Sequence, residues 1–367
     1  MENFIVSARK YRPDTFQTVV GQAQVSSTLK NAVASGKIAH AYLFCGSRGV
    51  GKTTTARIFA KTINCSNLSA DTEPCNACES CVAFNENRSY NIHELDAASN
   101  RGVEEMQRLI DQVRIPPQVG KYSVFIIDEV HMLTAHAFNA FLKTLEEPPA
   151  HAKFILATTE KHKILPTILS RCQIYDFNRM TIDDTVKHLQ AVAAQEGVEA
   201  EEAALNIIAQ KADGAMRDAL SIFDQIVSFC GKQITYQQVI QNLNVLDYSY
   251  YFKLVDAFLK NEVPTALLIF NDILQHGFDG HHFINGLSSH LRDLLVCRDQ
   301  STVQLLQVGQ EVKEQYLKQA QGCEMAFLYE ALQICAECDV NYKANDNKRL
   351  AVEIALMRMA QLGLKKK

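Results

Sequence analysis

Residues 41–54 read AYLFCGSRGVGKTT: a run of five apolar residues is followed by Gly46, Ser47, Arg48, Gly49, Val50, Gly51, Lys52, Thr53 and Thr54. This pattern, GxxxxGK[ST] between a strand and a helix, is the P-loop motif. Its glycines let the backbone curl so that N–H groups face phosphate oxygens, and the following helix adds positive potential at its N-terminus. We therefore expect these residues to cradle a nucleoside triphosphate, with Lys52 on the β- and γ-phosphates and Thr53 on Mg²⁺.

A second apolar run, Ser123–Asp128, ends in two adjacent carboxylates, Asp128 and Glu129. We expect Asp128 to reach the same Mg²⁺ through its water shell. Glu129 is placed to polarise the water that attacks the γ-phosphate, which is the role of a general base. The two motifs together predict ATP hydrolysis, but they do not by themselves distinguish one kind of ATPase from another.

Residues 1–180 alternate short apolar runs with helical patterns. The predicted strands are Ala41–Cys45, Ile92–Asp96, Ser123–Asp128, Phe154–Thr158 and Gln173–Phe177. Their nearly continuous apolar character is typical of strands buried on both faces of a parallel sheet. Between them, helical spacing is clearest at Phe138, Phe141, Leu142 and Leu145. The pattern predicts an α/β fold with helices on both faces of the sheet.

After about residue 180 the strand pattern stops and helical periodicity continues to the C-terminus. It is interrupted near Gly197, Gly214, Pro264, Gly277 and Gly322. A chain of 367 residues is long enough for two or three domains. We expect three, with boundaries at 1–180, 181–242 and 243–367.

The last predicted helix, 347–362, carries apolar residues on roughly one side. These are Leu350, Ile354, Met357 and Leu362.

Four cysteines, Cys65, Cys75, Cys78 and Cys81, form the pattern C-x9-C-x2-C-x2-C in an insertion at about 64–84 that follows the P-loop helix. Four thiolates from one small loop suit tetrahedral Zn²⁺ with bonds of about 2.3 Å, and a closed Cys₄ shell is typical of a structural site. An iron–sulfur cluster is the alternative metal, although the C-x3-C-P continuation of a ferredoxin motif is missing. Free thiols are the third interpretation.

The other cysteine and histidine pairs favour simpler interpretations. Cys335 and Cys338 lie in an apolar helical stretch, so we expect them in a core. His281 and His282 precede an amphipathic segment, and we expect them to be solvated.

The net charge is -4, whereas a protein that simply coats nucleic acid is usually basic. Any DNA contact would therefore come from a local basic surface or from an assembly. The sequence has no apolar run of about 18 residues and no secretory pattern at its N-terminus. We expect a cytoplasmic protein without membrane contact, whose cysteines are reduced or bind metal.

Several further motifs follow one another in a fixed order. Arg12–Phe16 with Val19–Gln22 resembles the RPxxFxxVVGQ start of clamp-loader ATPases. The segments DEVH at 128–131, FILATT at 154–159, SRC at 170–172 and GAMRDAL at 214–220 resemble their DExx box, sensor 1 strand, SRC motif and sensor 2 helix. Together with the cysteine insertion, the chain resembles the γ/τ ATPase subunits of the bacterial DNA polymerase III clamp loader. The likeness covers residues 7–225, and the helical remainder fits the collar domain of that family.

The resemblance implies an AAA+ domain with a zinc-binding insertion over residues 1–180, a small helical lid over 181–242, and an all-helical collar for oligomerisation over 243–367. It also implies roles for single residues. Thr159 would orient the lytic water, Arg217 would touch the γ-phosphate from the lid, and Arg171 would act as an arginine finger on a neighbouring subunit's ATP. The adenine pocket would be built from Ala8, Tyr11, Arg12, Pro13, Val19 and Val20.

The function that the resemblance implies is that of an ATP hydrolase within the DNA polymerase III holoenzyme, with ATP, Mg²⁺ and Zn²⁺ as cofactors. Its partners would be other clamp-loader subunits, the sliding clamp and primer-template DNA, onto which the clamp is loaded. Arg101, at the start of a predicted helix, is either a DNA phosphate contact or an ordinary helix-start residue. Two alternatives are another AAA+ DNA motor of the branch-migration type and a non-hydrolysing clamp-loader scaffold. A scaffold of this kind would lack the P-loop lysine, which is present as Lys52.

Overall fold

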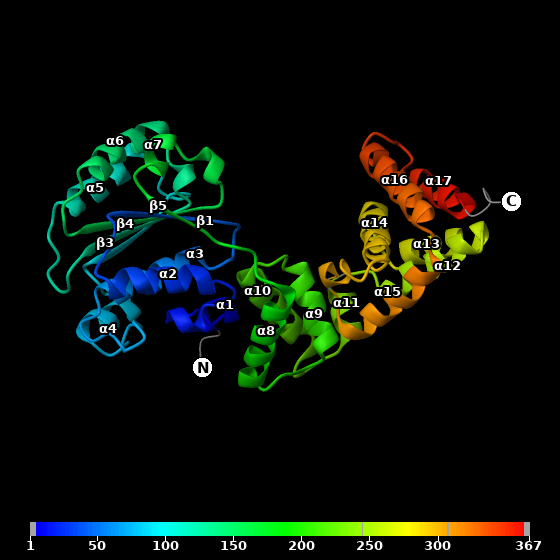
Figure 1. Ribbon diagram of the computed structural model, residues 1–367, viewed down its shortest axis with the longest axis horizontal. Helices are drawn as coiled ribbons and strands as arrows, with labels where there is room; N and C mark the ends of the chain where they lie inside the picture. Colours follow the sequence, from blue (N-terminus) through cyan, green and yellow to red (C-terminus); the bar gives the residue numbers. More distant parts are fainter. Residues whose placement is uncertain (1–4, 244, 307, 363–367) are drawn as a thin grey trace. The chain divides into compact units, whose positions relative to one another are not determined.

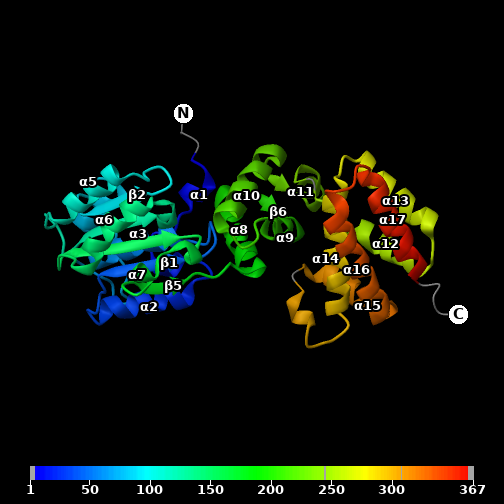
Figure 2. The same ribbon diagram turned by 90° about the horizontal axis from the view of Figure 1, so that it is seen from above.

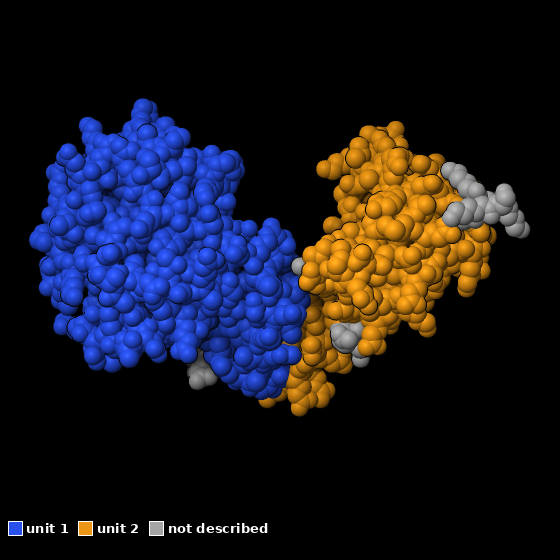
Figure 3. Space-filling model, viewed as in Figure 1, with its two compact units in different colours: residues 1–198, 208–228 blue, residues 199–207, 229–367 orange. Residues whose placement is uncertain are grey.

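The computed structural model describes residues 5–243, 245–306 and 308–362. The chain divides into two compact units (Figure 3). The first comprises residues 1–198 and 208–228, and the second comprises residues 199–207 and 229–367. Among the described residues, none of the helices combines the length and the apolar character needed to span a membrane.

A parallel five-stranded sheet with the order β2-β3-β4-β1-β5 forms the centre of the first unit (Figures 1 and 2). Its strands are β1 Ala41–Cys45, β2 Ile92–Asp96, β3 Ser123–Asp128, β4 Ala152–Thr158 and β5 Gln173–Asp176. The three central strands are buried almost throughout. The edge strands β2 and β5 are largely exposed or half-buried, so the expectation that all five are covered on both faces is wrong for these two. An edge strand has a neighbour on one side only, and β2 carries charged residues where the inner strands carry apolar ones.

Helices cover both faces of this sheet, as the sequence predicts (Figure 1). The helical segments of the first unit are α1 Ser7–Lys10, η1 Phe16–Thr18, α2 Ala23–Ala34, α3 Lys52–Ile63, α4 Glu79–Asn85, α5 Val103–Val113, η2 Val130–Met132, α6 Ala135–Glu146, η3 Lys161–Lys163, α7 Pro166–Leu169, α8 Ile182–Glu196 and α10 Met216–Cys230, which runs two residues past its boundary. Alternate residues of β1 point to opposite faces: Leu43 packs with α5 and α6, and Tyr42 packs with α2 and α3. The predicted spacing on α6 is confirmed, because Phe138, Phe141 and Leu145 are buried and Leu142 is half-buried against the same core.

The second unit is helical around one core. Its elements are α11 Tyr236–Asn242, α12 Tyr248–Leu259, α13 Val263–Gln275, α14 Gly280–Val296, η4 Val303–Leu305, α15 Gln310–Gly322, α16 Met325–Tyr342 and α17 Lys348–Gln361, and α9 Glu202–Lys211 crosses the boundary of the two units. Two strands of two residues each, β6 Glu199–Ala200 and β7 Gln233–Ile234, pair in parallel. These strands could not be predicted from the sequence, because a strand of two residues has no alternation to detect. Pro264 lies in the first turn of α13, where its missing N–H costs nothing, so it marks a helix start.

The apolar side expected for the last helix is not the buried one. In α17, Val352, Leu356 and Met359 are buried, whereas Leu350 and Ile354 are 45% and 46% exposed. Apolar residues occur around most of this helix, so their spacing alone does not select a face. Packing against α13 and α16 decides which side is covered.

The predictions for the cysteine pair Cys335 and Cys338 and for the histidine pair His281 and His282 differ in outcome. Cys335 and Cys338 are buried in its core, which confirms the sequence interpretation. His282 is exposed, but His281 is only partly so: its Nε2 lies 2.8 Å from Asp339 Oδ1, and its ring stacks on Tyr342. Both histidines lie in the first turn of α14 and do not precede it.

Candidate functional site

The P-loop connects β1 to α3 and folds as the motif requires. Gly51, the residue before α3, has φ of 100°, and Gly49 has φ of 78°. A Cβ on Gly49 would also come within 2.9 Å of the Cβ of Ala215, so the loop needs glycine there. Lys52 begins α3 and donates from Nζ to the carbonyl oxygens of Gly46 and Ser47, both at 2.8 Å. Burial lowers the pKa of Lys52, while the nearby Glu129 and Asp128 carboxylates oppose that shift.

The two predicted Mg²⁺ ligands meet at the carboxyl end of β3. Thr53 Oγ1 donates to Asp128 Oδ2 at 2.6 Å, although the two residues lie on different elements. The other carboxylate oxygen of Asp128 accepts from the backbone N–H of Glu129 at 2.9 Å. A hydroxyl beside a carboxylate is the hard oxygen donor set that Mg²⁺ prefers.

Glu129 is held by the end of the neighbouring strand. Its Oε2 accepts from Thr159 twice, from the backbone N–H at 3.2 Å and from Oγ1 at 3.0 Å. His131 Nδ1 lies 3.4 Å from the same oxygen and 3.0 Å from Thr158 Oγ1, and its side chain is only 5% exposed. The DEVH motif contains His131, but no role was predicted for it. Its position two residues beyond Glu129, in the turn η2, was the available signal.

A cavity of about 440 Å³ in the first unit joins these residues to the N-terminal segment. All six residues expected for the adenine pocket line it, namely Ala8, Tyr11, Arg12, Pro13, Val19 and Val20. The lining also includes the expected residues Arg48, Gly49, Gly51, Lys52, Thr53, Thr54, Asp128, Glu129 and Arg217. Gly46, Ser47, Val50 and Thr159 do not line it. Thr159 is instead connected to the cavity through its bonds to Glu129.

Five lining residues were not expected from the sequence: Asp96, Met180, His188, Met216 and Leu220. Met216 and Leu220 lie one residue before and three residues after Arg217 in α10. The helical neighbourhood of the arginine was therefore the available signal for them. Nothing in the local sequence distinguishes Met180 or His188. Burial lowers the pKa of His188, which favours a neutral ring at the cavity wall.

Cations gather around the cavity. The pKa of Arg12 is lowered first by partial desolvation and then by the nearby cation Arg57, with Arg217 contributing in the same direction. Arg217 lies close to the P-loop, since a Cβ added to Gly49 would be 3.5 Å from the Cβ of Arg217. Four cationic side chains line the cavity, Arg12, Arg48, Lys52 and Arg217, against the three carboxylates Asp96, Asp128 and Glu129, and such cations suit a polyphosphate.

Arg171 is not brought to this cavity. Its Nη2 lies 2.7 Å from Glu146 Oε1 at the end of α6, and its Nη1 donates to the carbonyl oxygen of Thr167 at 2.6 Å. The Arg171 side chain remains one-third exposed. It therefore has no contact with the P-loop of its own chain in this arrangement.

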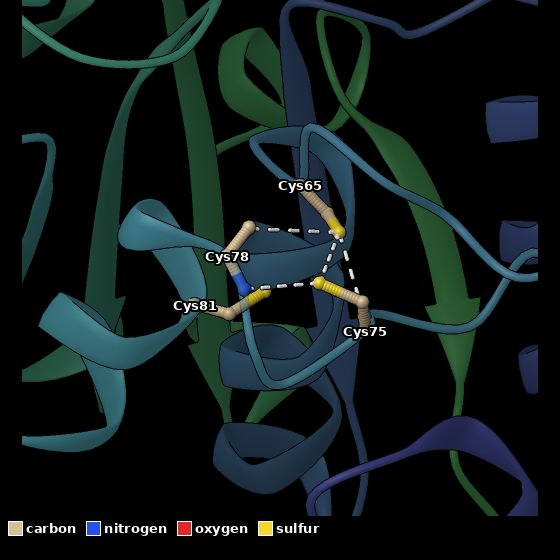
Figure 4. A group of neighbouring side chains, drawn as sticks. All are labelled: Cys65, Cys75, Cys78 and Cys81. Atoms are coloured by element: carbon tan, nitrogen blue, oxygen red, sulfur yellow. Dashed lines mark hydrogen bonds between the residues drawn. The ribbon is translucent and has the colours of Figure 1, made fainter.

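The four inserted cysteines converge at one point (Figure 4). Their sulfurs all lie within 4.8 Å of one another, with Cys65 and Cys75 at 3.5 Å and Cys78 and Cys65 at 4.0 Å. A tetrahedron with bonds of about 2.3 Å has sulfurs about 3.8 Å apart, so the donor set and its spacing fit Zn²⁺. Backbone N–H groups of Cys75 and Cys78 donate to the sulfurs of Cys65 and Cys75.

The acidity of the thiols differs within the cluster. Burial opposes ionisation of Cys78, but hydrogen bonds from Ser66 and from Cys81 outweigh it and lower the pKa of Cys78 to about 6. Burial raises the pKa of Cys81. A cation at the centre would compensate the second effect, because thiolates are the form that binds metal.

Comparison with known proteins covers nearly the whole chain. Residues 21–181 match the family "DNA polymerase III, delta subunit". Residues 184–232 match "DNA polymerase III clamp loader subunit, ATPase lid domain", and residues 234–366 match "DNA polymerase III subunits gamma and tau domain III".

Similar proteins carry the same family names. DNA polymerase III subunit gamma of Buchnera aphidicola (subsp. Acyrthosiphon pisum) is 33% identical over 357 residues, which are 97% of this chain and 99% of that protein. Subunit tau of Bacillus subtilis is 40% identical over 353 residues, 96% of this chain and 62% of tau. Subunit tau of Escherichia coli is 41% identical over 277 residues, 76% of this chain and 43% of tau. The chain thus spans less than two thirds of the tau relatives. It belongs to the family of DNA polymerase III gamma and tau subunits.

Proposed function

We propose that this chain is an ATP-hydrolysing subunit of a DNA polymerase III clamp loader, in which ATP binding and hydrolysis drive the opening of a sliding clamp and its loading onto primed template DNA. One observation carries the proposal: the cavity joins the P-loop lysine, the Thr53–Asp128 pair and Glu129 to the N-terminal segment. Family membership supports the same conclusion.

In the proposed mechanism the adenine lies against Val19, Val20 and Pro13, and the phosphates face the P-loop N–H groups. Lys52 exchanges its two carbonyl acceptors for phosphate oxygens. Mg²⁺, held by Thr53 and Asp128, would neutralise the developing charge. The two bonds from Thr159 fix one oxygen of Glu129, so the other is aimed to accept the proton of the attacking water.

Two arginines complete the proposed chemistry. Arg217, at the cavity wall, would contact the γ-phosphate from α10. Arg171 would break its contact with Glu146 and act on the ATP of a neighbouring subunit. The fact that it does not line the cavity of its own chain supports this assignment. Arginine suits both positions because it stays protonated and forks onto phosphate oxygens.

The proposed assembly includes other clamp-loader subunits, the sliding clamp and primer-template DNA, in the cytoplasm. Within the chain we propose an AAA+ domain at 1–180, a lid at 181–242 and a collar at 243–367. The four cysteines would bind a structural Zn²⁺. Arg101 is exposed beside Gly102, which precedes α5, and its Nε donates to the Ala98 carbonyl, so it remains a candidate phosphate contact.

The test is ATP hydrolysis by the chain assembled with its partner subunits, measured with and without sliding clamp and primed DNA. We expect stimulation by both together. Lys52→Ala is the control: hydrolysis no greater than that of this variant would show a scaffold. Hydrolysis that responds to DNA junctions but not to the clamp would indicate a motor of the branch-migration type.

A further inference from the structure

We infer that Glu73 is a positioning residue for nucleotide binding. It belongs to the cysteine loop, residues 65–75, and its carboxylate binds the backbone of residues 16–17, which lead into the adenine side of the cavity at Val19 and Val20. The inference rests on the nucleotide site proposed above. It assigns to the cysteine insertion a role in setting nucleotide affinity, in addition to its local structural role.

The carboxylate of Glu73 is buried and fully engaged. The residue is 8% exposed. Its Oε2 accepts from the backbone N–H of Phe16 at 2.8 Å, and its Oε1 accepts from that of Gln17 at 3.0 Å. Lys30 Nζ, from α2, lies 2.7 Å from Oε1. A buried carboxylate is stable only when it is paired in this way, so the three contacts hold it in one place.

The two backbone donors belong to the short helix η1, Phe16–Thr18. The first N–H groups of a helix have no partner within it, so an acceptor from outside fixes the position of the turn. Val19 and Val20 follow directly, and the N–H of Val19 donates to the Phe16 carbonyl at 3.2 Å. Both valines line the cavity. Glu73 therefore acts on the apolar wall of the cavity through η1.

At its other end, Glu73 is part of the loop between Cys65 and Cys75. Ser69 bonds it twice: Ser69 Oγ accepts from the N–H of Glu73, and the N–H of Ser69 donates to the Glu73 carbonyl, both at 3.0 Å. A second link runs from the residue directly after Cys75, since Asn76 Nδ2 donates to Asp14 Oδ2 at 3.2 Å. The path from the four sulfurs to Val19 is thus short and made of hydrogen-bonded groups.

The test compares two ligands of the full chain: a ribose-labelled fluorescent ADP and inorganic tripolyphosphate, which competes for the P-loop but has no base. We expect Glu73→Ala to weaken ADP binding roughly tenfold, the effect of about 1.4 kcal/mol. Tripolyphosphate affinity should be unchanged, because η1 does not touch the phosphate side. Glu73→Gln keeps one acceptor oxygen and should show a smaller loss, and it serves if the alanine variant fails to fold. Asp71→Asn, an exposed acid in the same loop, is the matched control.

Removal of the metal with a chelator provides the second arm. In the wild type, stripping should weaken ADP binding by a similar factor; in Glu73→Ala it should add little, because the connection is already broken. Bound zinc is measured for every variant. Equal losses for ADP and tripolyphosphate, or additive effects of stripping and substitution, would overturn the inference. If the wild type binds no adenine nucleotide at all, the proposed function itself fails, which is a distinct result.

Discussion

His290 lies in the core of the second unit with both ring nitrogens engaged. Nδ1 is 2.8 Å from the hydroxyl of Tyr316, and Nε2 is 3.4 Å from Gln319 Oε1. The amide nitrogen of Gln319 donates to Asp256 and to the Phe252 carbonyl, so its oxygen faces the ring and accepts from it. Burial raises the pKa of Tyr316, so its phenol stays protonated and can donate a hydrogen bond to Nδ1. Both contacts suit a neutral ring that accepts at Nδ1 and donates at Nε2, and burial lowers the pKa of His290 to about 4, which keeps the ring neutral at pH 7.

The stability of the second unit should therefore fall as the solution is acidified. The unfolded chain binds a proton on this histidine near pH 6.5, whereas the folded chain does so only near pH 4. Stability due to the neutral ring is present above pH 6.5 and is lost as pH falls from 6.5 towards 4. Between pH 7 and pH 5 the expected loss is about 2 kcal/mol, and the full shift corresponds to about 3 kcal/mol. Asp293 acts in the opposite direction, because burial raises its pKa although Arg292 opposes that shift.

The assay compares the wild type with His290→Gln, which keeps a hydrogen-bonding side chain but does not titrate. The chain has no tryptophan, so Phe327→Trp on α16, introduced into both proteins, gives a fluorescence signal from the second unit alone. Urea unfolding at pH 7 and pH 5 yields the free energies. The wild type should lose about 2 kcal/mol more than the variant. Because Asp293 is common to both proteins, its contribution cancels. Equal losses in the two proteins would refute a neutral, buried His290.

Three further predictions concern the first unit. Glu129→Gln should bind ATP with wild-type affinity but hydrolyse it about 10²–10⁴-fold more slowly, as measured by phosphate release; a wild-type rate would exclude Glu129 as the base. Elemental analysis should find one Zn²⁺ per chain, and stripping should lower the melting temperature; iron, or no metal in protein prepared without chelator, contradicts the zinc assignment. Arg171→Ala and Lys52→Ala should each be nearly inactive, yet a co-assembled mixture should recover part of the ATPase activity. Fingers supplied in trans change GTPase rates by about 10³–10⁵, so the defect should be large, and full activity of Arg171→Ala alone would place hydrolysis within one chain.

Much of the site could be predicted from the sequence because its motifs are contiguous. The P-loop needs glycines, a lysine and a threonine at fixed spacing. In the structure Lys52 contacts the Gly46 carbonyl and Thr53 contacts Asp128. The four cysteines lie within one short insertion, so their convergence follows from loop length and ligand chemistry. The parallel sheet likewise follows from apolar runs alternating with helical patterns.

The sequence was least informative where packing between distant segments decides which residues are buried or line the cavity. α17 carries apolar residues around most of its circumference, so only its contacts with α13 and α16 decide that Val352 is buried and Leu350 exposed. The wall of the cavity gains His188 from α8, a residue whose neighbours in sequence carry no motif.

The sequence by itself determined the motifs of the site: a P-loop, a pair of acids after a buried strand, and a cluster of four cysteines. These motifs depend on residue type and local spacing, and both can be read directly from the sequence. The tertiary structure alone decided which groups act on one another across that framework. It brought Thr159 into hydrogen-bond contact with Glu129. It also brought the Glu73 carboxylate to the N–H of Phe16, in the turn that precedes Val19. Each of these contacts joins residues 30 or 57 positions apart, and hydrogen bonds over such separations are set by how the elements pack, not by local pattern.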